Sequence, residues 1–258
     1  YRLDVDFDGI KDLLVAPNAK GVSENEKSIL FYHNSATNTN SNFIYQSNSF
    51  LQNEMIEHGL GSIPVLADIN GDGLDDLIVA NYFAYKPILN KESRLAYYKN
   101  TGSLTLPVFT FIDADLMNLS QSNLGLHIAP TFGDLNADGK LDMLLGKEDG
   151  QLALYVNTTT GSSPNFAVPS SNLQDNNGIA IQVGQFASPQ LFDLDKDGLL
   201  DLIIGEKTGT IIYYKNSGTA TLPQFTLTSS ILGGIDVSTT NPDGFPSPHF
   251  FSHQDSTY

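Results

Sequence analysis

The sequence predicts an all-β protein, a β-propeller made of four-stranded antiparallel blades. Two observations carry this prediction: an Asp-rich loop recurs four times along the 258 residues, and a similar series of short strand-like segments follows each loop. A third observation is the abundance of turn-forming residues, including 22 glycines, without a long helical pattern. Internal repetition of this kind is typical of propellers and solenoids.

The repeat unit is about sixty residues long, because the glycine shared by the loops recurs at Gly9, Gly73, Gly139 and Gly198. A Pro-led strand such as SPQLFD comes before the later loops, and an apolar strand such as DLIIG comes after them. A strand that ends at Asn, such as IIYYKN, and a short fourth strand, such as PQFTLT, complete the unit. The predicted repeats cover residues 1–61, 62–127, 128–186 and 187–246, with a partial fifth repeat over 247–258.

Radial stacking is the arrangement that these repeats favour. The apolar strand is an unbroken run, as in residues 202–204, which indicates burial on both faces. Four short strands cannot cover both faces alone, whereas blades stacked around an axis can. A solenoid would use shorter repeats, and a sandwich would need about two of these units. About four blades are visible. Pairing of the tail strand Pro248–Phe251 with the first repeat would close a ring of four blades, but a fragment of a larger ring of about seven blades is the stronger interpretation.

Composition excludes some classes of partner. The chain has 29 acidic and 13 basic residues, a formal net charge of −16, which disfavours binding to nucleic acid. No apolar run approaches the ~20 residues that a transmembrane helix needs. There is no cysteine, so disulfides and thiolate chemistry are excluded.

The four loops predict about four structural Ca²⁺ ions. Each loop fits D-x-[DN]-x-D-G-x-x-D, in which alternate side chains supply hard oxygens and the glycine at position 6 permits a tight reversal. We expect side-chain ligands at positions 1, 3, 5 and 9 and a backbone carbonyl at position 7, since Ca²⁺ takes six to eight oxygens. The predicted ligands are Asp4, Asp6, Asp8, Ile10 and Asp12 in loop 1; Asp68, Asn70, Asp72, Leu74 and Asp76 in loop 2; Asp134, Asn136, Asp138, Lys140 and Asp142 in loop 3; and Asp193, Asp195, Asp197, Leu199 and Asp201 in loop 4.

Two other interpretations of the loops are less favoured. An EF-hand shares the first six positions, but its twelfth position requires Glu, where these loops hold Val15, Val79, Leu145 and Ile204. A strand rather than a helix follows each loop, so the EF-hand is excluded. Ordinary Asp/Asn/Gly turns without metal are the remaining alternative, which four matches in register make a poor explanation.

These motifs resemble the FG-GAP/VCBS repeat family, whose best-known members are the propellers of integrin α-subunits. The Pro-led strand, the Asp loop, the apolar strand and the Y-x-N-x-G strand end carry the resemblance, and DLNADGKLDMLLG looks most like repeats of secreted bacterial proteins. The resemblance implies a propeller with calcium between the first two strands of each blade, in an extracellular or cell-surface protein. It implies no single activity, because the family includes adhesion modules, lectin-like modules and the scaffolds of some polysaccharide lyases.

The expected function is binding or adhesion to a protein or carbohydrate ligand. The longest connections fall on the rim opposite the calcium loops, where binding residues on a rigid scaffold are usually found. Tyr82, Phe83 and Tyr85 are the candidate ligand-binding residues, because aromatic rings stack on sugars and anchor protein partners. The alternative is that these rings pack on the neighbouring blade. His58 and His127 occupy equivalent positions in two of these connections and are interpreted as surface or capping residues.

Two further function classes stay open. One is the propeller scaffold of a polysaccharide-active enzyme such as a lyase, and the other is a spacer that binds no ligand. The few basic residues are scattered, and H-E-x-x-H, G-x-S-x-G and P-loop patterns are absent. An active-site cleft would need such groups to converge, so a non-enzymatic module is favoured.

Overall fold

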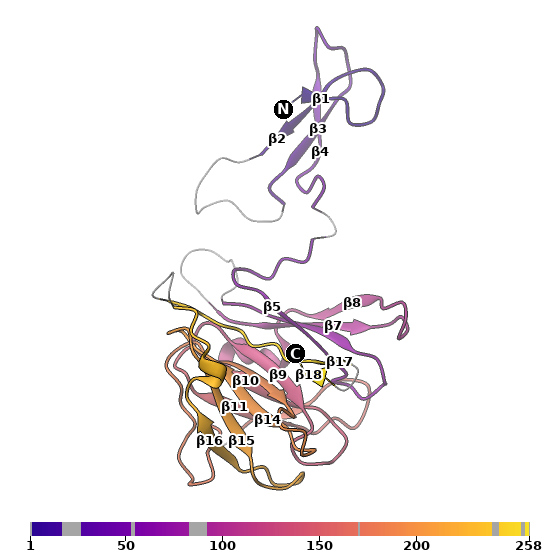
Figure 1. Cartoon of the computed structure of the whole chain (residues 1–258). Coiled ribbons are helices and arrows are strands. Elements are labelled where there is room, and N and C mark those ends of the chain that lie inside the picture. The colour runs from indigo at the N-terminus through magenta and orange to yellow at the C-terminus, as the bar shows by residue number, and fades with distance from the viewer. Residues whose placement is uncertain are drawn as a thin grey trace. The chain divides into compact units, whose positions relative to one another are not determined.

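The computed structural model describes residues 2–16, 27–52, 55–82, 92–169, 171–238, 243–253 and 256–257 (Figure 1). The chain divides into two compact units, residues 1–59 and residues 60–258. The described residues form four four-stranded sheets and one two-stranded hairpin, and every strand pair is antiparallel. No sheet closes on itself, and the prediction of an all-β protein built of propeller blades is confirmed.

The first unit contains one sheet, and the second contains three sheets of the same strand order. The first sheet comprises β1 (Arg2–Leu3), β2 (Asp12–Val15), β3 (Leu30–Asn34) and β4 (Phe43–Ser47). The second comprises β5 (Ile63–Ala67), β6 (Asp76–Ala80), β7 (Leu95–Asn100) and β8 (Phe109–Asp113). The third comprises β9 (Ala129–Gly133), β10 (Asp142–Gly146), β11 (Leu152–Asn157) and β12 (Phe166–Ala167). The fourth comprises β13 (Ser188–Phe192), β14 (Asp201–Gly205), β15 (Ile211–Asn216) and β16 (Phe225–Ser229).

Strands pair in chain order within each sheet, as expected for an antiparallel blade. The pairing of the third strand with the fourth shifts register at the same place in three repeats: Phe31/Tyr32, Tyr97/Tyr98 and Tyr213/Tyr214. Three shorter elements complete the chain, namely η1 (Leu116–Ser122), η2 (Leu232–Gly234) and the hairpin of β17 (Ser252–His253) with β18 (Ser256–Thr257).

The core of the second unit lies between neighbouring sheets. All residues of β10 and of β14 are buried. Met143 and Leu145 of β10 belong to a cluster shared with the second sheet, whereas Leu144 belongs to a cluster shared with the fourth. Because alternate residues of a strand face opposite sides, β10 is covered on both faces. This explains why its sequence is apolar throughout rather than alternating.

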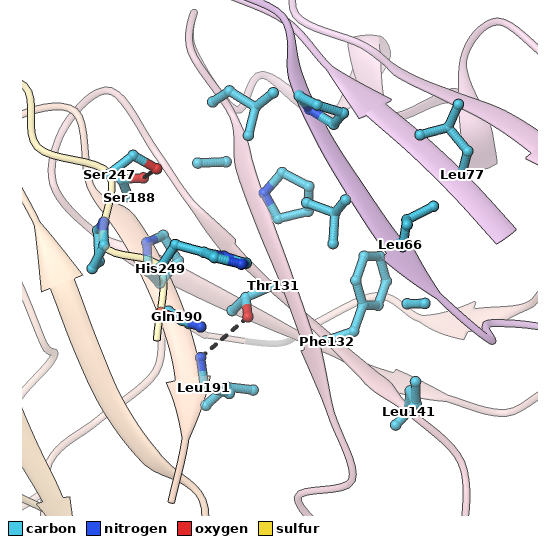
Figure 2. A pocket seen from close by; sticks show the side chains of 18 of the residues that line it. Leu66, Leu77, Thr131, Phe132, Leu141, Ser188, Gln190, Leu191, Ser247 and His249 are labelled. Carbon is cyan, nitrogen blue, oxygen red and sulfur yellow. Dashed lines mark hydrogen bonds between the residues drawn. The ribbon is translucent and has the colours of Figure 1, made fainter. Parts of the chain in front are cut away.

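The Pro-led strands of the second unit lie next to one another, with β5 contacting β9 and β9 contacting β13. The side chain one residue after the proline contacts the neighbouring strand. The Leu191 N–H of β13 donates to Thr131 Oγ1 of β9 at 3.1 Å. The chain near Phe250 continues the series, because the Gln190 amide binds both the N–H of Phe250, at 2.6 Å, and its carbonyl, at 2.8 Å. These strands and this segment line a cavity of about 720 Å³ (Figure 2).

Candidate metal sites

The four predicted loops connect the first strand of each sheet to the second, and they share one hydrogen-bond skeleton. The carboxylate at position 1 accepts from the N–H of position 5 at 3.1–3.2 Å and from the glycine N–H of position 6 at 2.8–2.9 Å. The carboxylate at position 5 accepts from the N–H of position 7 at 2.7–3.1 Å. The four glycines have φ between 81° and 88°, a conformation that side chains disfavour.

The aspartate at position 9 ties each loop to its blade. Its Oδ1 accepts the backbone N–H of the asparagine that ends the third strand, at 2.8 Å in every repeat. In loops 1, 3 and 4 its Oδ2 accepts the N–H of position 2, at 3.0–3.1 Å. The residue is at most 1% exposed in all four repeats, so these contacts are shielded from water. The four members of this set are Asp12, Asp76, Asp142 and Asp201.

Oxygen atoms of several loop positions converge. In loops 1 and 4 the carboxylates of positions 1, 3 and 5 each bring an oxygen to within 4.8 Å of the others. In loop 2 the Asn70 amide nitrogen donates to Asp76 Oδ2 at 2.7 Å and to the Tyr97 hydroxyl at 3.3 Å. The oxygen of the same amide, Asn70 Oδ1, is buried and has no hydrogen-bond partner among the described residues.

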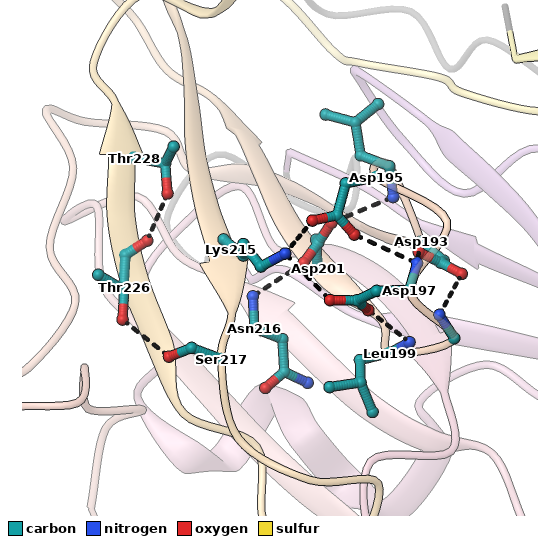
Figure 3. A network of polar contacts seen from close by, with 12 residues as sticks. Asp193, Asp195, Asp197, Leu199, Asp201, Lys215, Asn216, Ser217, Thr226 and Thr228 are labelled. Carbon is teal, nitrogen blue, oxygen red and sulfur yellow. Dashed lines mark hydrogen bonds and ion pairs between the residues drawn. The ribbon is translucent and has the colours of Figure 1, made fainter.

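Basic side chains from the third strand contact three of the loops. Lys215 of β15 lies 3.0 Å from Asp197 Oδ2 and is also in close contact with Asp195 (Figure 3). Lys99 of β7 lies 2.9 Å from Asp72. His33 Nδ1 of β3 lies 3.3 Å from Asp6 and 3.2 Å from Asp12. The sequence interpretation missed these residues, although a basic residue directly before the strand-end asparagine recurs in three repeats.

The electrostatics of the loops follow from burial and from these contacts. Burial raises the pKa of Asp142, and the nearby carboxylates of Asp138 and Asp134 raise it further. Burial also raises the pKa of Asp76. The Lys99 ammonium holds the pKa of Asp72 below its usual range, and Lys215 does the same for Asp197. The buried position-9 carboxylates of loops 2 and 3 are therefore costly to keep charged without a nearby cation.

The donor set fits a hard divalent cation. Carboxylate and amide oxygens are the ligands that Ca²⁺ prefers, and each loop gathers at least three carboxylates. Asn70 Oδ1, the buried oxygen without a hydrogen-bond partner among the described residues, is an oxygen that such an ion could use. The Lys215 ammonium already places a positive charge on the oxygens of loop 4.

The rim opposite the loops carries a row of rings. Tyr82 packs against His127, with centroids 6.1 Å apart, and against Phe186 at 5.9 Å. His127 lies 5.3 Å from Phe186, and Phe186 lies 5.2 Å from Phe245. Phe83 and Tyr85, the other predicted ligand-binding residues, lie outside the described residues. Tyr82 thus takes part in packing between blades, and its role in ligand binding stays a prediction.

The row of rings has an unusual backbone. His127, Phe186 and Phe245 have φ of 60°, 57° and 45°, and each stands three residues before the proline of its repeat. Gly61 occupies the same place in the second repeat with φ of 62°. The correspondence of His58 with His127 is therefore wrong, because the structure aligns His127 with Gly61. Burial lowers the pKa of His127, and its Nε2 has no hydrogen-bond partner among the described residues.

None of the helices in the described part of the chain has the length and apolar character that crossing a membrane requires.

Comparisons with known proteins agree with this architecture. A model of the FG-GAP-like repeat matches residues 4–79 and 68–145. The chain is 29% identical to integrin alpha-4 of Xenopus laevis over 151 residues, which is 56% of this chain. It is 28% identical to human integrin alpha-7 over 170 residues and 24% identical to mouse integrin alpha-7 over 168 residues, each 64% of this chain. The matched region covers 14% of the length of each of these relatives.

Proposed function

The chain belongs to the FG-GAP-like repeat family, and on that basis we propose that it is a calcium-stabilised extracellular propeller module that binds a protein or carbohydrate ligand. The observation that carries the calcium assignment is the hydrogen-bond skeleton common to the four loops. It fixes the same acidic positions in the same places in every repeat. Chance turns would share neither the spacing nor the buried aspartate at position 9.

The ligands of the four ions are the side chains at positions 1, 3, 5 and 9 of each loop and the backbone carbonyl at position 7. In loop 3 these residues are Asp134, Asn136, Asp138, Lys140 and Asp142. When bound, Ca²⁺ supplies the positive charge that offsets mutual repulsion among the carboxylates. The protein's own contribution is to hold those oxygens together through backbone N–H donors. The role is structural, because every loop joins two strands of a blade.

The extracellular location rests on the likeness to integrin alpha chains. The sequence of the repeats favours a secreted or surface protein of bacterial type. We place the ligand on the rim opposite the calcium loops, around Tyr82. That rim combines the longest connections with a row of aromatic rings, two features that favour recognition.

Calcium removal tests the structural role. We expect thermal unfolding in excess EGTA to begin at a markedly lower temperature than in millimolar Ca²⁺, since a ligand that binds only the folded state stabilises it. Calorimetric titration of the EGTA-treated protein should show about four ions bound per chain. Identical melting curves, or no binding heat at several temperatures, would refute the assignment.

The proposed binding of a protein or carbohydrate is tested separately from calcium binding. A glycan array and a panel of immobilised extracellular proteins would be probed with the chain in Ca²⁺ and in EGTA. Binding that requires Ca²⁺ and is lost in Tyr82→Ser supports the proposed rim. Binding to neither panel would favour the spacer interpretation, and release of unsaturated sugars from an acidic polysaccharide would favour a lyase.

A further inference from the structure

The residue directly before the strand-end asparagine is held at the same place in every repeat. The backbone N–H of that asparagine is bound to the position-9 aspartate at 2.8 Å in all four. In repeats one, two and four the side chain of the preceding residue contacts the loop of its own blade. We call it the flanking residue; it is His33, Lys99, Val156 and Lys215 in repeats one to four.

In repeats two and four the flanking residue is a lysine that contacts the loop oxygens. Lys99 Nζ lies 2.9 Å from Asp72 Oδ2, at position 5. Lys215 Nζ lies 3.0 Å from Asp197 Oδ2, also at position 5, and contacts Asp195 at position 3. The ammonium groups therefore occupy oxygens that are ligands of the proposed Ca²⁺ ions.

Loop 3 lacks such a partner. Its flanking residue is Val156, a half-buried side chain without charge. Among the described residues, no Lys, Arg or His nitrogen lies within 4.0 Å of a carboxylate of Asp134, Asp138 or Asp142. Three acidic side chains in one turn are thus left without an opposite charge from the described part of the chain.

We propose that the flanking residue sets how strongly each loop depends on calcium, an inference that rests on the proposed calcium binding. A flanking lysine is an internal counter-ion: it stabilises loops 2 and 4 when the metal is absent and weakens calcium binding, because the ammonium and the ion compete for the same oxygens. Loop 3, with valine, has no such substitute. It is the loop whose order depends most on calcium.

Reciprocal substitutions test this inference. Lys215→Met removes the counter-ion from loop 4, and Val156→Lys adds one to loop 3, while Val156→Met changes length without charge. Calcium binding would be followed loop by loop in EGTA-buffered calcium, from the amide NMR signals of Gly139 and Gly198. These amides report on their own loops because each donates to the position-1 aspartate.

Lys215→Met should lower the dissociation constant at Gly198 about threefold to tenfold and should lower the melting temperature in EGTA. Val156→Lys should have the opposite effects at Gly139, and Val156→Met should have neither. Lys207→Met is the charge-matched control: Lys207 lies at the other end of β14, near Asp243. It should leave both dissociation constants within about twofold, because distant surface charges are screened.

The outcomes separate this inference from the proposed function. If calcium moves neither glycine signal in the unmodified protein, calcium binding itself is wrong. If calcium binds but Lys215→Met changes neither its affinity nor the melting temperature in EGTA, the flanking lysine is not a counter-ion. An equal change in Lys207→Met would also overturn the inference, since net charge alone would then explain the effect.

Discussion

At the residue scale, the aspartate at position 9 has two functions that ordinary motif matching merges into one. It is a predicted calcium ligand, and it is also the acceptor for backbone N–H groups of the loop and of the third strand. These hydrogen bonds belong to the protein itself. The blade therefore depends on this residue even without metal.

Asp142→Asn separates the two functions. An amide nitrogen cannot accept, so the N–H of Leu135 or of Asn157 would lose its partner in a buried place. We expect the free energy of unfolding in EGTA to fall by about 1–3 kcal/mol, measured by urea denaturation, because the unpaired buried N–H costs more than is gained by removing a carboxylate that Asp134 and Asp138 repel. Asp149→Asn makes the same change at a side chain that is 56% exposed and should cost about 0.5 kcal/mol or less. Equal stability of the two variants in EGTA would contradict this account.

The titration of His127 should make the free energy of unfolding depend on pH. Burial lowers its pKa below 6.5 in the folded state, and the charge of Glu148 only partly opposes this shift. The unfolded chain therefore takes up a proton before the folded chain does. The stability that neutral His127 contributes is complete above pH 6.5 and is lost as the pH falls below 6.5 toward the lowered pKa.

His127→Phe tests this dependence, because phenylalanine occupies the equivalent place at Phe186 and Phe245 with the same left-handed backbone. We expect the unmodified protein to lose more stability than the variant between pH 8 and pH 5.5, in urea denaturation with Ca²⁺ present. Parallel pH profiles would show that His127 is not responsible.

Single residues were predictable where a repeat fixed their spacing. The position-1 and position-9 aspartates follow from the motif, because each loop reads D-x-[DN]-x-D-G-x-x-D. The contacts of the flanking residues with the loops and the packing of the row of rings could not be predicted from the motif. Lys215 is distant from Asp195 in sequence, and only the pairing of β14 with β15 brings the two together.

At the scale of the element, contacts between Pro-led strands connect the blades. The open edge of β13 would leave the Leu191 N–H without a backbone partner, and Thr131 Oγ1 of β9 accepts it. Gly146 and Gly205, at the ends of β10 and β14, permit the close approach of the next repeat: a Cβ at Gly146 would lie 2.2 Å from the Ala187 carbonyl oxygen. The blades therefore pack through backbone as well as through apolar side chains.

Thr131→Val tests the contact between strands. Valine fits this place, since Val65 stands one residue after the proline in the second repeat. Loss of the acceptor leaves the Leu191 N–H buried and unpaired, which should lower the free energy of unfolding by about 1–2 kcal/mol. Thr226→Val, at an exposed hydroxyl paired with Ser217, should change it by about 0.5 kcal/mol or less. If Thr131→Val lowers the free energy of unfolding no more than Thr226→Val does, the hydrogen bond from Leu191 to Thr131 contributes nothing to stability.

Strand type was predictable from pattern, and packing between strands was not. The unbroken apolar runs at β10 and β14 indicated burial on both faces, which the structure confirms. The equivalent β2 is less buried in its own unit, where Val15 is 40% exposed. The connection before β9 contributes to the core as well, because Leu116 and Leu119 of η1 are buried there.

At the scale of the whole molecule, the acidity of the chain and its architecture have a common explanation. Much of the net charge of −16 is concentrated in four loops at equivalent places, and the proposed calcium binding would make it ligand for cations rather than solubilising surface. The repeat could be recognised from sequence because the loops are local. The identity of a ligand could not be predicted, because the connections on the rim proposed to bind it differ between repeats.

The most direct test of the central claim is an anomalous difference map from crystals grown in calcium, with diffraction collected at long wavelength. We predict one peak in each of the four loops, surrounded by oxygens from positions 1, 3, 5 and 9 and by the carbonyl of position 7. Loops with ordered protein density and no peak would contradict the account.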